Sequence, residues 1–169
     1  MSLQNWLRNG WLVEHRTSRQ EITDLLNMAD RDLVQCQTSH LSPDWQLNIA
    51  YNAALQAATA ALAAAGYRAA REAHHYRVIQ SLAFTVKADP GMVAQLDKFR
   101  KKRNIGSYER AGAVSELEAR EMFALAKNLR DEVEKWASLK PSEAFLKTRT
   151  DICLFTQALR LVVYATCPP

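Results

Sequence analysis

An alanine-rich stretch, residues 50–65, is the feature of this sequence that most restricts its fold. Alanine has the highest helix propensity, and its small side chain lets neighbouring helix axes come close together. Ser42 as N-cap and Pro43 at the first helical position predict where this helix begins. Gly66 predicts where it stops or bends. We therefore expect a central helix that packs against neighbours on several sides.

Helical periodicity also dominates the rest of the chain. The capping-box spacings of Ser18 with Glu21 and of Ser115 with Glu118 predict two more helix starts, and Asp89-Pro90 predicts another. No segment shows the alternation typical of a strand. The pattern predicts an all-α fold, an antiparallel up-down helical bundle with four principal helices plus an extra C-terminal helix.

The bundle is expected to form a single helical domain over residues 1–169. Its core spans about residues 18–137, and the C-terminal helical extension spans about residues 141–165. A shorter helical segment is expected to start at Tyr67 or Ala73 and to end at Phe84. A turn is expected at residues 104–107, with Gly106 free to adopt a positive φ.

Composition excludes several functional classes. With 169 residues, 48% of them hydrophobic, the chain can form one real core and is too apolar to be disordered. Its three cysteines are an odd number without CxxC spacing, which indicates a reducing cytoplasm. Metal-ligand spacings and glycine-rich nucleotide loops are absent from the sequence, so we expect neither metal nor cofactor. No apolar stretch reaches the ~20 residues that a membrane span needs.

Arg103 is the most informative charged residue. Met92, Leu96 and Phe99 recur at i, i+4 and i+7, and Arg103 takes the next place on the same helix face. This spacing directs a guanidinium toward the interior or toward the rim of a groove. Because burying an unpaired arginine is costly, Arg103 should have a dedicated partner or face an anion. The net charge of +4 is concentrated in the same place, at residues 98–103, which favours a solvated helix end or an anion or RNA footprint.

His74 and His75 are the histidines with the best claim to a function. Adjacent residues of a helix project about 100° apart, so at least one of the two can face inward. A lone helical histidine is more often a surface residue or a satisfied part of the core.

The order of these features resembles the HEPN domains. The matching features are the alanine-rich helix with Tyr51, then residues 66–68, then residues 74–76, and finally residues 99–104 followed by Tyr108. The resemblance implies a small helical bundle, often a homodimer, of the kind that partners nucleotidyltransferases or belongs to toxin–antitoxin systems. It also implies a cytoplasmic interaction protein that binds a nucleotide, RNA or protein partner, with Arg100, Arg103, Asn104 and Tyr108 as ligand-binding residues.

RNase members of that family have a histidine a few residues after the arginine, and here Tyr108 occupies that place. Tyrosine is a poor general base at neutral pH, so a binding role is the interpretation that we favour. Two alternatives stay open. One is a metal-independent endoribonuclease in which Arg103 holds the phosphate and His74 or His75 accepts the proton. The other is a structural bundle without ligand.

In that structural alternative, Arg103 pairs with an acidic residue such as Asp97 or Glu109. Asn104 would then cap the helix, and Tyr108 would only pack with its hydroxyl hydrogen-bonded.

Overall fold

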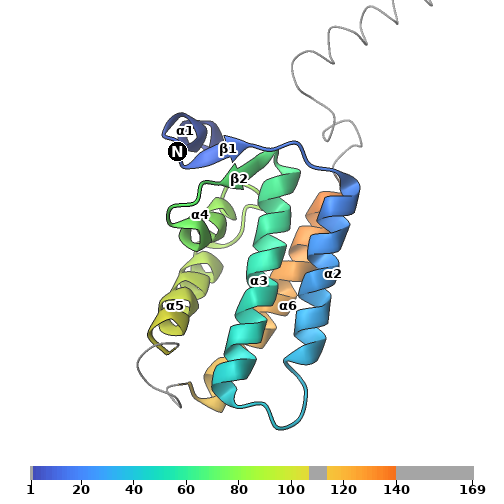
Figure 1. The fold of residues 1–169 in the computed structure, drawn as a ribbon, viewed down its shortest axis with the longest axis vertical. Helices are drawn as coiled ribbons and strands as arrows, with labels where there is room; N and C mark the ends of the chain where they lie inside the picture. The colour runs from blue at the N-terminus through green and yellow to red at the C-terminus, as the bar shows by residue number, and fades with distance from the viewer. Residues whose placement is uncertain (1, 107–113, 140–169) are drawn as a thin grey trace, which may run out of the picture.

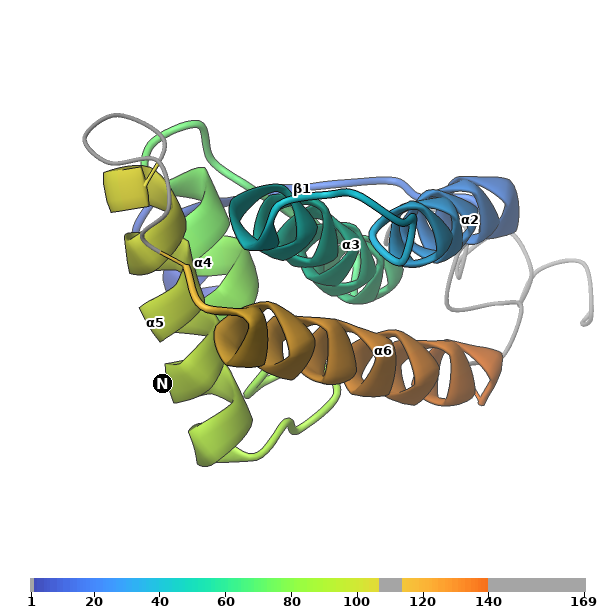
Figure 2. The same ribbon diagram turned by 90° about the horizontal axis from the view of Figure 1, so that it is seen from below.

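Helix α3 (Pro43–Ala64) is the centre of the molecule, with α2 (Arg19–Gln35) and α5 (Pro90–Gly106) on opposite sides of it and α6 (Glu116–Ser138) along a third (Figures 1 and 2). The computed structural model of the chain describes the backbone of residues 2–106 and 114–139 and the side chains within these ranges except those of residues 104–106. The remaining elements are α1 (Leu3–Arg8), β1 (Leu12–Glu14), β2 (Tyr67–Ala69) and α4 (His74–Ser81).

The central position of α3 follows from its small side chains. Nine alanines of this helix are buried, and they lie on faces that contact α2, α6 and the α4–α5 side. Because a methyl group takes little room, three layers of neighbours can approach one helix without leaving voids. The predicted central helix is confirmed.

Helix starts match the predicted caps. The Oγ atoms of Ser18, Ser42 and Ser115 each accept a hydrogen bond from the backbone N–H three residues later. Ser115 and Glu118 form a complete capping box. Helix α5 begins at Pro90, after Asp89, whose carboxylate accepts hydrogen bonds from the next two free N–H groups at 2.7 and 3.3 Å. Consecutive long helices alternate in direction, as an up-down bundle requires (Figure 1).

The absence of strands was predicted wrongly. Leu12–Glu14 pairs antiparallel with Tyr67–Ala69, which forms a two-stranded sheet at one end of the bundle. Each strand has three residues, too few for an alternating pattern to appear in the sequence. Gly66, at φ 88°, turns the chain out of α3, so Tyr67 lies in a strand and the following helix begins at His74.

A turn was also expected at residues 104–107. Instead, α5 continues through Gly106. The stripe that led to Arg103 is otherwise as predicted, with Leu96 and Phe99 buried against the core. Residues 107–113 and the expected C-terminal helix at 141–165 lie outside the described residues.

Overpacking α3 should destabilise the fold. Ala57 is fully buried, so Ala57→Leu forces extra carbon atoms between the helices and should lower the free energy of unfolding by about 1–3 kcal/mol in urea titrations. Gln56→Leu is the matched control, because Gln56 is only partly buried and leucine is a good helix former. Equal effects of the two changes would contradict close packing around α3.

Candidate functional site

Arg103 lies where α5 meets α3. Its Nε donates a hydrogen bond of 3.2 Å to the Asn48 side-chain oxygen, and its guanidinium carbon is 5.1 Å from the centre of the Tyr51 ring. Asn48 and Tyr51 are one turn apart on α3, so a single helix face supplies both contacts. An amide oxygen and an aromatic ring orient the guanidinium and carry no net charge of their own.

Tyr51 connects Arg103 to α4. Tyr51 is 1% exposed, and its hydroxyl lies 3.4 Å from Nδ1 of His75, at the long end of hydrogen-bond distances. Burial raises the pKa of Tyr51 to about 12, although the positive charges of Arg103 and Arg100 act in the opposite direction. The hydroxyl is therefore protonated at neutral pH, and whether it donates to Nδ1 or accepts from it depends on the tautomer of His75.

Both predicted histidines belong to this cluster. His75 and His74 are partly buried, and their rings are 5.9 Å apart in an edge-on arrangement. Burial lowers the pKa of His75, and the charges of Arg103, His74 and Arg100 lower it further. Burial also lowers the pKa of His74. Both imidazoles are therefore neutral at pH 7, close to two permanent cations.

Arg100 supplies the second cation. Its Nε donates a 2.7 Å hydrogen bond to Asp97, and its guanidinium lies 5.4 Å from the centre of the Tyr76 ring. Asp97 also binds Lys101 at 2.8 Å. Burial raises the pKa of Asp97, but the hydrogen bonds from Lys101 and Arg100 outweigh burial and leave that pKa below its usual value. Asp97 thus anchors Arg100 on the same helix.

These contacts define what we call the Arg103 cluster. Its members are Asn48, Tyr51, His74, His75, Tyr76, Arg100 and Arg103. Two arginines and two neutral imidazoles in partly dehydrated surroundings form an arrangement suited to a phosphate group. Arginine offers paired N–H donors to such an anion, and a nearby negative charge would favour protonation of the imidazoles.

Sequence reasoning identified most members of this cluster but missed Asn48. The available signal was its position three residues before Tyr51, which places both side chains on the same face of the helix. Two other predicted residues cannot be placed. Tyr108 and the side chain of Asn104 lie outside the described residues, as does Glu109.

Other chemistries find little support in the described part of the chain. No group of three or more histidine, cysteine or acidic side chains there could hold a metal ion. Across residues 2–106 and 114–139, no helix combines the length and apolar character that crossing a bilayer requires. Cys36 is buried, and burial raises the pKa of its thiol to about 11, so this thiol is a poor nucleophile.

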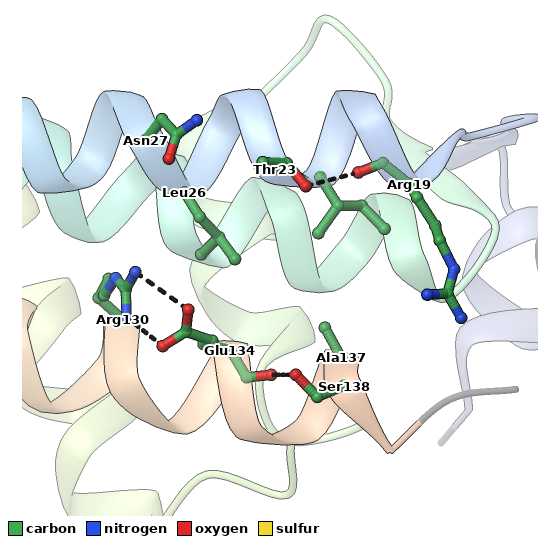
Figure 3. Close-up of a pocket in the computed structure, with 9 residues that line it drawn as sticks. Arg19, Thr23, Leu26, Asn27, Arg130, Glu134, Ala137 and Ser138 are labelled. Carbon is green, nitrogen blue, oxygen red and sulfur yellow. Dashed lines mark hydrogen bonds and ion pairs between the residues drawn. The ribbon is translucent and has the colours of Figure 1, made fainter. Parts of the chain in front are cut away.

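A groove of about 210 Å³ between α2 and α6 is a competing site (Figure 3). Thr23, Arg130, Glu134 and Ser138, which line it, bind one another or nearby carbonyl groups. Glu134 binds Arg130, Thr23 donates to the carbonyl of Arg19, and Ser138 donates to the carbonyl of Glu134. Arg130 also pairs with Asp30 at 2.6 Å. We interpret this groove as part of the contact between the two helices.

The chain was compared with protein-family models, curated proteins and solved structures, and none of the three comparisons found a match. The geometry of the Arg103 cluster therefore carries the functional argument.

The cluster predicts acid sensitivity. The unfolded-state pKa of a histidine is 6.5, and His75 and His74 have lower values in the fold. Between pH 6.5 and those lower values the unfolded chain binds protons that the folded chain does not, so stability falls as pH falls, by at most about 1.4 kcal/mol per pH unit for each histidine. Urea titrations from pH 8 to pH 5 should show a shallower loss for His75→Gln than for the wild type. Parallel profiles for the two proteins would contradict the lowered pKa.

Proposed function

We propose that this chain is a HEPN-like cytoplasmic interaction protein that binds phosphate groups of a nucleotide or RNA at the Arg103 cluster. The proposal includes the predicted homodimer and a protein partner of the nucleotidyltransferase or antitoxin kind. The observation that carries the binding site is the convergence of Arg103 and His75 on one buried tyrosine, Tyr51, with Arg100 over the neighbouring ring of Tyr76.

The contacts that hold the two arginine side chains in place favour binding. Asn48 and Tyr51 fix the direction of Arg103, and Asp97 fixes Arg100, whose side chain is only 21% exposed. Holding long side chains in place before a ligand arrives reduces the entropy lost on binding. A partly buried guanidinium also interacts more strongly with an anion than a fully solvated lysine does.

The hydrogen bond between Tyr51 and His75 is compatible with two tautomers of the neutral histidine. In the tautomer in which Tyr51 donates to Nδ1, His75 carries its own proton on Nε2. That nitrogen can donate to a phosphate oxygen but cannot accept a proton from a ribose hydroxyl. We include this tautomer in the proposed binding function, because it makes His75 a ligand-binding group and not a general base.

An endoribonuclease is the second candidate, and the nearness of His74 and His75 to Arg103 is the observation that favours it. His74 is the better base of the two, since no bond from Tyr51 fixes its tautomer in the structure described. A cleavage assay on single-stranded RNA in the presence of a chelator tests this candidate. Cleavage that persists with chelator and disappears in both His74→Ala and Arg103→Ala would replace binding by catalysis. Intact RNA under these conditions supports the binding function.

Arg103→Ala should weaken binding of inorganic tripolyphosphate and of short RNA by about tenfold to a hundredfold. This range corresponds to the ~1.5–3 kcal/mol of a hydrogen bond to a charged group. Loss of the hydrogen bond to Asn48 should lower the melting temperature little, because that amide is neutral and belongs to a partly exposed residue that water can reach. Calorimetric titration and thermal melting measure the two effects.

Lys101→Ala is the control for that experiment, since Lys101 is an exposed cation of the same helix that pairs with Asp97. It should reduce the salt dependence of RNA binding and leave most of the affinity. If Arg103→Ala instead lowers the free energy of unfolding by about 3–5 kcal/mol and neither protein binds an anion, the structural alternative is correct.

A further inference from the structure

We propose that Tyr76 stacks on a nucleobase, so that the Arg103 cluster recognises an unpaired nucleotide and not a bare phosphate group. The inference rests on the proposed function and deepens it, because it assigns a ligand class and a residue that selects it. The shared chemistry is a nucleoside phosphate, which either a free nucleotide or a single-stranded RNA can supply.

The exposure of Tyr76 is the first observation. Tyr76 follows His75 on α4 and is 44% exposed, whereas Tyr51 is 1% exposed. One exposed aromatic side chain is ordinary on a protein surface. Tyr76 differs in its position, because the residue beside it and the guanidinium over its ring both belong to the phosphate-binding cluster.

The second observation is that two arginine–aromatic pairs lie side by side. Arg103 covers the ring of buried Tyr51 at 5.1 Å, and Arg100 covers the ring of exposed Tyr76 at 5.4 Å. The buried pair can only orient its arginine. The exposed pair presents an aromatic surface next to a cation, and this combination binds single-stranded nucleic acids through bases and phosphates together.

The third observation is that the exposed pair is held in place. Asp97 binds Nε of Arg100 at 2.7 Å, and the Asp97 side chain is only 13% exposed. The position of Arg100 over Tyr76 is therefore set by α5 before any ligand binds. A base that stacks on the Tyr76 ring would place its attached phosphate within the reach of Arg100 and Arg103. A duplex hides its base faces within the stack, so it would lack this contact.

The test compares five ligands with the full-length chain. They are a single-stranded RNA pentamer, an abasic pentamer with the same sugar–phosphate backbone, an RNA duplex, a nucleoside monophosphate and inorganic tripolyphosphate. The variants are Tyr76→Ala, Tyr76→Leu and Tyr76→Phe. Phenylalanine keeps the ring, whereas leucine fills much of the same volume without an aromatic face, so Tyr76→Leu separates stacking from packing.

We expect the wild type to bind the intact pentamer about tenfold more tightly than the abasic pentamer, as the contribution of one stacked base predicts. Tyr76→Ala and Tyr76→Leu should abolish this difference, and Tyr76→Phe should retain it. In Tyr76→Ala and Tyr76→Leu, the affinities for the abasic pentamer and tripolyphosphate should fall less than the affinity for the intact pentamer. If the affinity for the nucleoside monophosphate also depends on the Tyr76 ring, the ligand is a free nucleotide. If only the affinity for the intact pentamer depends on the ring, the ligand is a single strand.

Three results would overturn the inference. Equal affinity of the wild type for the intact and abasic pentamers would exclude base recognition while leaving phosphate binding in place. An equal loss of affinity for both pentamers in Tyr76→Leu would show that Tyr76 only positions Arg100. Duplex binding as tight as that of the pentamer would exclude an unpaired base. If the wild type binds none of the five ligands, the proposed function itself fails, and this result is distinct from the other three.

Discussion

Close packing around the alanine face of α3 is the constraint on which the rest of the structure depends. Because most inward positions of α3 carry a methyl group, α2, α6 and the α4–α5 side can all reach the same helix. Tyr51 is one of three large side chains of α3 that are fully buried, together with Leu47 and Leu62. It lies between the α3 contacts of α4 and α5, where it contacts both His75 and Arg103. The packed face of α3 thus also supplies a central member of the candidate site.

The sequence was informative where a short-range pattern has a single physical cause. Serine caps and the proline at α3 set the helix starts, and the i, i+4, i+7 stripe correctly directed Arg103 toward the bundle. The paired strands were missed because three-residue strands are specified by the partner strand and by Gly66, not by their own pattern. The turn before residue 107 was predicted from Gly106, but an isolated glycine only lowers helix propensity, and α5 continues through it.

The charged residues and histidines of the candidate site could be predicted from the sequence, but the residues that orient them could not. Arg103, His74 and His75 stand out in a sequence because each is a polar residue at an apolar or helical position. Asn48 does not stand out, because it is one of four amide side chains in α3, and amide side chains of a helix usually face solvent. Its role depends on the rotation of α5 relative to α3, which only the tertiary packing determines. The same holds for the bond between Tyr51 and His75, which joins residues 24 positions apart.

The buried tyrosine also bears on the chemistry that the histidine beside it can perform. A hydroxyl with a pKa of about 12 stays protonated, and in the tautomer in which it donates to Nδ1, neutral His75 offers a donor and not an acceptor on its other nitrogen. Burial, together with the charges of Arg103, His74 and Arg100, holds the pKa of His75 below its usual value. Under the proposed function, the negative charge of a bound phosphate would raise this pKa, and a protonated imidazole would add a third cation. Ligand binding and protonation would then reinforce each other, as expected of a site that retains phosphate groups.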